Sequence, residues 1–423
     1  MLTPYPGITL IMIASHKDII SCQDCGHVYD LPHVAENQQL ECKFCSHVML
    51  INRPDWEHKV SAFTISGTIL FILANIFPFI GLESAGQVQH SNLIGGVHAL
   101  IQRDEFLLAS IVFITIFLFP LFELLGLLYI LLFRFMNVRA PFVGKIVHLL
   151  HIAKPWGMLE IFLVGLAVAS LKLGAFAEIV VGTGLYAFIG LVLTLIVNNI
   201  YLSREDIWDW LKHENFFASD ENEAVISCHC CEAHVGVSLL AINNKCPRCG
   251  THIHIHHPHS VQKTSALLLA ALVLYIPSNL LPIMTTTNLG QETTDTLFSG
   301  VVHLIQSGDF PIAMVVFFAS IVVPIAKLLV MGYLLWNVSI NFKGDPNQMA
   351  RLYRVTEFVG RWSMIDVFVV TTLVALVQFG LLANIEPGGA LLCFAGVVVL
   401  TMLAAETFDP KLIWDAYEKT KTD

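Results

Sequence analysis

The sequence predicts an all-α integral membrane protein with about eight transmembrane helices in two parallel four-helix repeats, each preceded by a small cytoplasmic four-cysteine zinc ribbon of β structure. Three observations carry this prediction. The 423 residues are 55% hydrophobic and only 13% charged, whereas soluble domains hold about 25% charged residues. Eight of the ten cysteines form two sets of paired Cys-x2-Cys motifs. The second half of the chain also repeats the pattern of the first half.

The apolar runs are long enough to cross a bilayer, which takes about 20 consecutive, mainly apolar residues. Lys172 and Glu178 lie between the third and fourth runs and are expected to shorten that hairpin. We expect no cleavable signal peptide, because the apolar stretch near the N-terminus is short and lacks a basic leader. The eight predicted spans lie near 61–80, 107–133, 158–174, 179–200, 265–284, 311–336, 364–383 and 388–406.

The positions of Lys and Arg predict the orientation, because cytoplasmic loops carry an excess of both. Four such residues lie in segment 134–157 and four in segment 337–363. The loops at the opposite end, 81–106 and 285–310, hold only Arg103. We therefore expect both termini and the linker between the repeats to be cytoplasmic. A net charge of −10 gives no sign of a nucleic-acid partner.

The cysteine spacing predicts two structural metal sites. In each set two Cys-x2-Cys knuckles are separated by sixteen or fourteen residues. Four thiolates at such spacing form the tetrahedron that structural zinc prefers, and they leave no open position for catalysis. We predict one zinc ion in each set, formed by Cys22, Cys25, Cys42 and Cys45 and by Cys228, Cys231, Cys246 and Cys249.

Other interpretations of these polar segments stay open. The cysteines can instead form disulfides or a redox motif, although a cytoplasmic location favours metal, and iron can replace zinc. Cys230 is a spare thiol or a substitute ligand, and Cys393 packs within an apolar run. The histidines of segment 252–259 form the polar face of a last ribbon strand, or a metal relay or pH sensor.

The internal repeat covers nearly the whole chain. Its matching pairs include "NIFP" at 75–78 with "NLLP" at 279–282, and "PWGMLEIF" at 155–162 with "RWSMIDVF" at 361–368. Four spans in each copy give both copies the same orientation, as in parallel-repeat transporters. The predicted domains are zinc ribbon 1 at 15–57, transmembrane repeat 1 at 58–212, zinc ribbon 2 at 213–259, transmembrane repeat 2 at 260–416 and a cytoplasmic tail at 417–423.

Ionisable residues within the apolar runs are functional candidates, because each costs about 2.5–3.5 kcal/mol on insertion scales. Lys327 lies in the sixth run, and Asp366 lies near the start of the seventh. These two side chains can pair between neighbouring helices. Ser320 and Thr401 can add hydroxyl groups to the same region. The alternative is that these residues lie at the membrane interface or only hold helices together.

Proline and tryptophan mark further positions. Pro120 and Pro324 lie within spans, where proline frees a backbone carbonyl and can kink the helix. Trp208 and Trp414 follow the last span of each repeat, and we predict that they anchor the chain at the inner membrane interface. The sequence holds no nucleophile–base set, phosphate-binding loop or HExxH motif, so we expect no enzyme activity.

Two long motifs accompany the duplicated ribbons and spans: "EFVGRWSMIDVFVV" at 357–370 and "FDPKLIWD" at 408–415. Together they resemble the paraquat-inducible protein A family, from about residue 20 to residue 416. The resemblance implies a multi-pass protein of the bacterial inner membrane. It also implies a partner in the periplasm with MCE (mammalian cell entry) domains, which form a tunnel.

The resemblance further implies that the chain loads phospholipid into this tunnel, or accepts it, and so maintains the outer membrane. It places lipid-cavity or proton-relay candidates at Ser320, Lys327, Asp366 and Thr401, with Lys172 from the first repeat. Two alternatives stay open. The chain can be an anchor or scaffold for the tunnel, with ribbons that recruit a cytosolic partner. It can also transport a metal or small solute, as its many His and Cys residues indicate.

Overall fold

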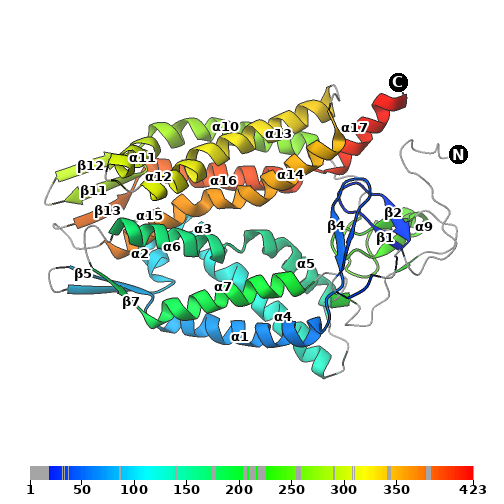
Figure 1. Ribbon diagram of the computed structural model, residues 1–423, viewed down its shortest axis with the longest axis horizontal. Helices are drawn as coiled ribbons and strands as arrows, with labels where there is room; N and C mark the ends of the chain where they lie inside the picture. Colours follow the sequence, from blue (N-terminus) through cyan, green and yellow to red (C-terminus); the bar gives the residue numbers. More distant parts are fainter. Residues whose placement is uncertain are drawn as a thin grey trace.

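The computed structural model describes residues 19–30, 32, 34–36, 38–84, 87–136, 138, 141–173, 178–202, 207–208, 216–217, 225–242, 244–253, 259–288, 291–306, 308, 310–340, 344–377 and 383–422. Two helical modules lie side by side along its length (Figure 1). We call residues 56–201 the first module and residues 260–407 the second module.

Small strands form two ribbons at one end of the molecule (Figure 1). The first ribbon holds two antiparallel pairs, β1 (Ile19–Ser21) with β2 (Val28–Asp30) and β3 (Gln39–Glu41) with β4 (Val48–Ile51). The second ribbon holds a three-stranded sheet in the order β8-β10-β9, from β8 (Phe216–Phe217), β9 (Val225–Ser227) and β10 (His234–Gly236), followed by helix α9 (Val237–Ile242).

Each module holds four spanning segments, of which the second and third are built from two helices each. The first module comprises α1 (Trp56–Ile76), α3 (Phe106–Phe113) with α4 (Phe119–Phe135), α5 (Val143–Ala153) with α6 (Leu159–Leu173), and α7 (Thr183–Tyr201). The second comprises α10 (Ser260–Leu280), α12 (Phe310–Phe317) with α13 (Val323–Ser339), α14 (Pro346–Gly360) with α15 (Ile365–Leu376), and α16 (Gly389–Thr407). The short helices α2 (Gly95–Gln102) and α11 (Leu297–Gln306) precede the second spans, and α17 (Lys411–Thr422) follows the last.

The described residues contain eight helical segments that are long and apolar enough to cross a membrane, which confirms the all-α membrane fold. The third and seventh segments begin earlier than predicted, at Val143 and Pro346. Three of the basic residues in the predicted loops lie on these helices, Lys145 on α5 and Arg351 and Arg354 on α14, and such charges interrupt the apolar pattern. The predicted loops at 134–157 and 337–363 are therefore largely helical, which corrects the sequence-based boundaries.

Both mid-span prolines follow a π-helical turn. The turns are Ile114–Leu118 before Pro120 and Phe318–Val322 before Pro324. Proline has no N–H to donate to the carbonyl four residues earlier, and its ring crowds that turn. A π turn lengthens the hydrogen-bonded loop by one residue, so it accommodates the proline without ending the helix. A π turn and a proline are both recognised sites of helix kinks, and a kink at Pro120 and Pro324 stays a prediction.

The sequence analysis did not predict two three-stranded sheets, one in each module. The first has the order β6-β5-β7, from β5 (Ile80–Ser84), β6 (Gln87–Ser91) and β7 (Glu178–Val181). The second has the equivalent order β12-β11-β13, from β11 (Met284–Asn288), β12 (Gln291–Asp295) and β13 (Ala383–Pro387). In both sheets the third strand comes from between the last two spans and pairs antiparallel with the first strand of a hairpin.

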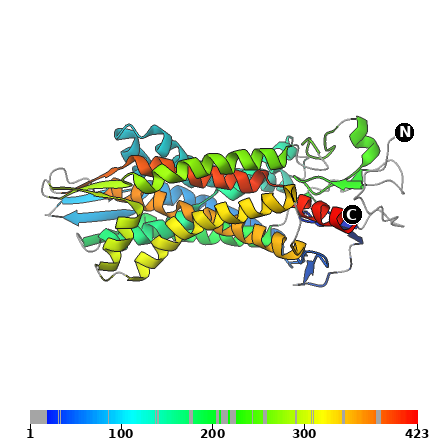
Figure 2. The same cartoon turned by 90° about the horizontal axis from the view of Figure 1, so that it is seen from above.

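Both sheets lie at one end of the molecule, and both ribbons lie at the other (Figures 1 and 2). We call these the sheet end and the ribbon end. The two modules therefore point in the same direction, which confirms the predicted parallel repeat. Four spans in each module return the chain to the ribbon end before the second ribbon begins.

A pseudo-two-fold axis relates the modules, and equivalent residues meet on it. The rings of Phe162 and Phe368, which are equivalent in the repeat, lie 5.6 Å apart between their centroids, where α6 packs against α15. Gly165 allows this close packing, because a Cβ there would lie 3.1 Å from the Cβ of Phe368. At the ribbon end the hydroxyl groups of the equivalent residues Ser21 and Ser227 contact each other.

The first ribbon packs against the second module rather than the module that follows it in the sequence. Its cysteines share a hydrophobic cluster with Met349 and Trp414. Arg354 of α14 donates to Asp24 Oδ2 at 3.1 Å and to the Cys45 carbonyl at 2.9 Å. The amino-terminal segment therefore crosses to the far half of the molecule.

The second ribbon packs against the first module in the corresponding way. Its cysteines share a hydrophobic cluster with Trp208, and the Arg248 guanidinium lies 4.4 Å from the centre of that indole ring. On α5, a Cβ at Gly144 would lie 2.9 Å from Cys249 Cα, so glycine permits the helix to contact the ribbon backbone.

Trp208 and Trp414 are consequently not interfacial anchors, and that prediction is wrong. Their exposed fractions are only 0% and 8%. Each indole is enclosed between a module and a ribbon. A ribbon of this size has little core of its own, so large rings from the neighbouring module supply the apolar surface that it buries.

Candidate functional site

The backbone of each cysteine knuckle follows one pattern. In the first knuckle, Cys22 N–H donates to the His27 carbonyl at 2.8 Å, and Gly26 N–H donates to the Cys22 carbonyl at 2.9 Å. The other three knuckles repeat both bonds within 0.1 Å. The residue after the second cysteine has a positive φ in all four, which glycine adopts at least cost. These residues are Gly26, Ser46, Glu232 and Gly250.

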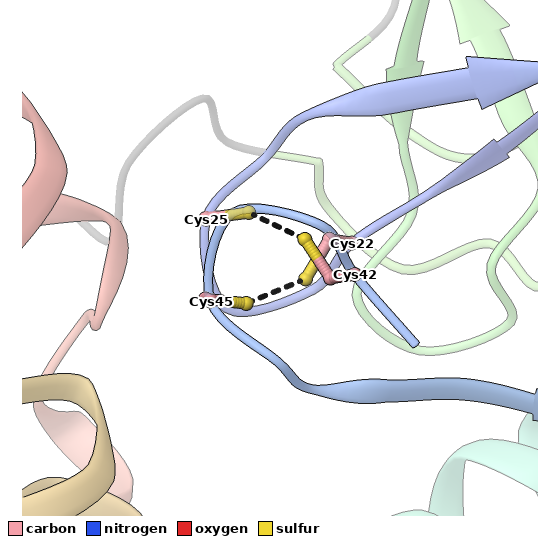
Figure 3. A group of neighbouring side chains, drawn as sticks. All are labelled: Cys22, Cys25, Cys42 and Cys45. Atoms are coloured by element: carbon pink, nitrogen blue, oxygen red, sulfur yellow. Dashed lines mark hydrogen bonds between the residues drawn. The ribbon is translucent and has the colours of Figure 1, made fainter. Parts of the chain in front are cut away.

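The four sulfur atoms of the first set point toward one another (Figure 3), and those of the second set are grouped in the same way. Within each set all four lie within 4.8 Å of one another. The sulfur atoms of Cys22 and Cys45 are 3.4 Å apart and those of Cys25 and Cys42 are 3.5 Å apart. In the second set, the pairs Cys228–Cys249 and Cys231–Cys246 are both 3.5 Å apart. A zinc tetrahedron with bonds of about 2.3 Å has edges of about 3.8 Å. Each cluster can therefore hold a metal ion.

All ten cysteines are free thiols, which contradicts the disulfide alternative. Hydrogen bonds from Cys22 and Cys25 lower the pKa of Cys45 to about 2, and a hydrogen bond from Cys228 lowers the pKa of Cys246 to about 7. Hydrogen bonds within the same sets raise the pKa of Cys25 and Cys231, so each set holds a thiolate beside protonated thiols, and a thiolate is the form that binds metal. Beside the first set, a hydrogen bond to Asp24 raises the pKa of His47.

The other predicted ribbon residues have separate positions. Cys230 is buried and hydrogen-bonds to the ligand candidate Cys249. His252 forms an isolated β-bridge with Lys245, as expected for a last ribbon strand. Residues 254–258, which hold most of the histidine cluster, lie outside the described residues. Cys393 is half-buried in α16, far along the chain from either set.

The second module contains a buried polar cluster at the predicted positions. Lys327 on α13 is 2% exposed, and its ammonium group donates to Thr401 Oγ1 at 3.0 Å and to the Gly360 carbonyl at 3.4 Å. Ser320 is fully buried in the π turn about two helical turns before Lys327, and its hydroxyl donates to the Val316 carbonyl at 2.5 Å. Helices α13, α14 and α16 therefore meet at the Lys327 ammonium group.

Asp366 lies on the first turn of α15 and is 5% exposed. Its pairing with Lys327 stays a prediction. Ser363, which the sequence analysis missed, is 1% exposed, and its hydroxyl has no hydrogen-bond partner among the described residues. Lys172 lies on the last turn of α6. It follows Glu160, the residue equivalent to Asp366 in the repeat, by twelve residues. That is about 18 Å along the helix axis, toward the sheet end.

The first module does not repeat this polar cluster. Glu123 and Glu160 stand where the second module has Lys327 and Asp366, and Leu195 stands where it has Thr401. The two modules share one backbone plan but differ in the charge that they carry inside it. Only the second module thus offers a buried cation at this position.

Comparison with known proteins agrees with this architecture. A model of the family described as "Paraquat-inducible protein A" matches residues 58–212 and 261–418, which together span both modules. The chain belongs to the paraquat-inducible protein A family. The two matched stretches correspond to the two copies of the repeat, and the four-cysteine ribbons precede each of them.

Several relatives match over nearly their whole length. "Intermembrane transport protein PqiA" of Escherichia coli (strain K12) is 34% identical over 94% of this chain and 95% of its own. "Lipophilic envelope-spanning tunnel protein A" of the same strain is 31% identical over 99% and 96%. "Probable intermembrane transport protein" of Haemophilus influenzae is 29% identical over 95% and 97%. No solved structure matches this family member.

Proposed function

We propose that the chain is an inner-membrane component of an intermembrane lipid transport system. It loads phospholipid into a periplasmic MCE-domain tunnel or accepts phospholipid from it, and it does not act as an enzyme. The names of the full-length relatives support intermembrane transport. The observation that carries the lipid assignment is the buried Lys327 ammonium group inside a membrane-spanning bundle.

A cation at this depth is expensive and needs a reason. A lysine near the middle of a spanning helix costs about 2.5–3.5 kcal/mol on insertion scales. The hydrogen bonds from Lys327 go to a hydroxyl and a carbonyl, which are neutral groups. An ammonium group that is held by neutral partners can also bind an anionic phosphate. We propose that the cluster of Lys327, Thr401, Ser320 and Asp366 handles a phospholipid headgroup or relays a proton.

The four-cysteine sets support two structural zinc ions. Cysteine fills all four positions of each set, and a zinc ion bound there would supply folding energy to a ribbon with little core. We place the ribbon end in the cytoplasm and the sheet end in the periplasm, following the basic residues on α5 and α14. Under this arrangement the sheets face the tunnel partner.

Replacing Lys327 with Ala tests the transport function. In a bacterial strain that lacks other envelope lipid-transport systems, we expect this variant to lose resistance to detergent and bile salts at normal protein levels. Lys263→Ala, at an exposed position on α10, is the control and should keep resistance. Normal resistance of the Lys327→Ala strain would contradict the proposal.

A scaffold is the second candidate, and one observation favours it. Strand β12 is one of the two edge strands of the second sheet, and its first four residues are exposed. An exposed edge can pair with a strand of another protein. A scaffold would tolerate Lys327→Ala but would lose tunnel binding when Thr293 on this edge is replaced with Pro. Co-purification of the tunnel protein with each variant separates the two functions.

A further inference from the structure

A fifth thiol lies against the second four-cysteine set. Cys230 stands in the chain between the ligand candidates Cys228 and Cys231. It is 2% exposed and hydrogen-bonds to Cys249, a ligand candidate from the other knuckle. Four cysteines already fill the corners of the metal tetrahedron. The set therefore needs no fifth ligand, and a reactive thiol is held beside one of the four.

The first ribbon has no thiol at the equivalent position. Asp24 stands there in the repeat. Its Oδ2 accepts a hydrogen bond from Arg354 Nη1 at 3.1 Å and lies 3.1 Å from His47 Nδ1. Segment 15–57 contains only the four cysteines of the first set. The two ribbons thus share one plan for a metal site, but only the second adds a thiol that can react with a ligand.

The residue equivalent to Arg354 also differs. It is His148 of α5, one helical turn after Gly144 and on the same face. Gly144 is the residue that brings α5 against the backbone of Cys249. His148 Nδ1 is buried and has no hydrogen-bond partner among the described residues. At these two positions of the repeat, a thiol and an imidazole therefore replace the ion pair of the first ribbon.

Cys249 is the most accessible thiol of the second set. It is 8% exposed, whereas each of the other three ligand candidates is at most 2% exposed. A Cβ on the next residue, Gly250, would meet no atom within 4 Å, so there is open space beside this knuckle. A water-sized oxidant therefore reaches Cys249 before it reaches Cys230. Cys25 of the first set is also 8% exposed but belongs to a ribbon without a fifth thiol.

We propose that Cys230 and Cys249 form a disulfide when a peroxide reaches the second ribbon, and that the ribbon then releases its zinc ion. The proposal rests on the zinc site proposed above and adds a regulation to it. The resting protein keeps all of its cysteines as thiols. We place the ribbon end in the cytoplasm, where disulfides are usually transient and serve catalysis or redox sensing. The contact between a ligand candidate and a thiol outside the tetrahedron carries the assignment.

The reaction balances with one hydrogen peroxide molecule for each disulfide. The Cys249 thiolate attacks one peroxide oxygen, the O–O bond breaks, and hydroxide leaves, so that Cys249 becomes a sulfenic acid. The Cys230 sulfur then attacks the Cys249 sulfur. An S–S bond forms, and the hydroxyl group of the sulfenic acid leaves as water with the proton of Cys230. The two sulfur atoms lose two electrons, and the peroxide gains them.

The oxidised ribbon keeps three of its four ligands, and its hold on the first module should weaken. A ribbon with so little core depends on its metal for folding. In the intact protein it encloses Trp208, which is 0% exposed, under the guanidinium of Arg248. Loss of zinc would open this contact. The first ribbon would stay loaded and docked on the second module, so the redox switch acts on one half of the molecule.

Peroxide treatment of the purified, zinc-loaded full-length protein tests the proposal. The zinc content is measured first, and a colorimetric chelator then reports release. We expect one of the two ions to leave about tenfold faster than the other, because a thiol held beside the reacting sulfur reacts intramolecularly. Release of both ions at the same rate would overturn the proposal.

Mass spectrometry of the native protein identifies the bond. After peroxide treatment the remaining thiols are alkylated and the chain is cut with trypsin, which separates Cys246 from Cys249 at Arg248. We expect the peptide of Cys249 to be linked to Cys230, and fragmentation distinguishes Cys230 from its neighbours Cys228 and Cys231. A Cys249 linked to any other cysteine, or to none after the fast release, would overturn the proposal.

A matched pair of variants isolates the fifth thiol. Cys230→Ser should still bind two zinc ions but should lose the fast release, so that both ions leave at the slow rate. Cys393→Ser, which removes a thiol from α16, should keep the fast release. Cys230→Ala replaces Cys230→Ser if that variant does not fold. Fast release that persists without Cys230 would overturn the proposal.

Reversal separates a switch from damage. Dithiothreitol with added zinc should restore the second ion, because a disulfide is reducible. Loss that cannot be reversed would indicate oxidation of the ligands to sulfinic acids and would overturn the switch. Fewer than two zinc ions before peroxide is added would contradict the metal site itself, and the switch with it. Two ions without fast release would contradict the switch alone.

Discussion

Burying the Lys327 ammonium group in a spanning segment costs free energy, which supports the functional role proposed for this residue. Its recorded partners are neutral, and the Thr401 hydroxyl also donates to the Val398 carbonyl. Removing the ammonium group therefore leaves no buried charge of opposite sign among these partners. We expect Lys327→Met to fold at least as well as the native chain, because the change removes the cost of burying an ammonium group, about 2.5–3.5 kcal/mol on insertion scales.

Denaturant unfolding of the purified variant measures this difference, and the outer-membrane resistance assay measures function. Loss of resistance with unchanged or raised stability is the expected result. A variant that is clearly less stable than the native chain would mean that Lys327 mainly holds helices together.

Cys25 is predicted to bind metal, and replacing it should affect one ribbon only. We expect Cys25→Ser to lower the bound zinc from two ions per chain to one, because the second set lies in a separate ribbon. Elemental analysis of the purified protein measures the zinc, and limited proteolysis should locate new cleavage within residues 19–51. Cys393→Ser is the control and should keep two ions. If the Cys25→Ser variant still bound two zinc ions per chain, the proposed first metal site would be wrong.

The metal-ligand candidates are easier to predict from the sequence than the residues that pack around the polar sites. The spacing of Cys22, Cys25 and their partners limits how four thiols can converge, so the sets follow from local geometry. Ser363 was missed because a serine beside an apolar run carries no signal of its own. The burial of Trp414 was missed because it depends on the first ribbon, at the other end of the chain. The burial of Trp208 was missed because the sequence does not show that the second ribbon, which follows it, folds back onto this ring.

At the scale of elements, the contact between α5 and the second ribbon should be sensitive to one methyl group. A Cβ on Gly144 meets the Cys249 backbone, which cannot move aside as a flexible side chain would. We expect Gly144→Ala to destabilise the protein by about 1–3 kcal/mol through overpacking. Gly332→Ala, where a Cβ meets nothing, should instead gain about 0.5–1 kcal/mol from helix propensity.

Thermal unfolding of both variants in the same detergent tests this pair. The two melting temperatures should move in opposite directions from that of the native chain. A parallel shift would show that α5 and the ribbon do not make the contact described.

The spanning helices follow from the sequence, but the sheets do not. A run of apolar residues signals a helix by itself, whereas β13 pairs with a hairpin about a hundred residues earlier. Strands β11 and β12 are rich in threonine and lack a clear apolar face. The early starts of α5 and α14 were hidden for a related reason, since their charges interrupt the apolar pattern.

For the whole molecule, the pseudo-two-fold packing of α6 against α15 predicts a cross-link. Gly165 and Phe368 have Cβ positions 3.1 Å apart, close to the separation in disulfides, about 3.5–4.5 Å. We expect the double variant G165C/F368C to form a bond between the modules under mild oxidation. After cleavage of the linker between the modules, gel mobility should report one joined species.

The control pairs F368C with G190C, because Gly190 faces Leu70 within its own module. That pair should stay unlinked. A cross-link in the control, or none in the G165C/F368C variant, would contradict the packing of the two modules. The parallel orientation of the modules was predictable from the even number of spans in each. The contact between the equivalent residues Phe162 and Phe368 was not, because it depends on how the two modules pack.

The crossed ribbons also impose an order on biogenesis. The first ribbon is translated before any spanning helix, yet its docking partner Arg354 lies about 300 residues later. At about 5–20 residues per second, the ribbon waits roughly 15–60 s for that partner to leave the ribosome. During this interval a bound metal ion, rather than the rest of the protein, must keep the newborn segment folded. Cells short of zinc should therefore lose newly made chains before they lose mature ones.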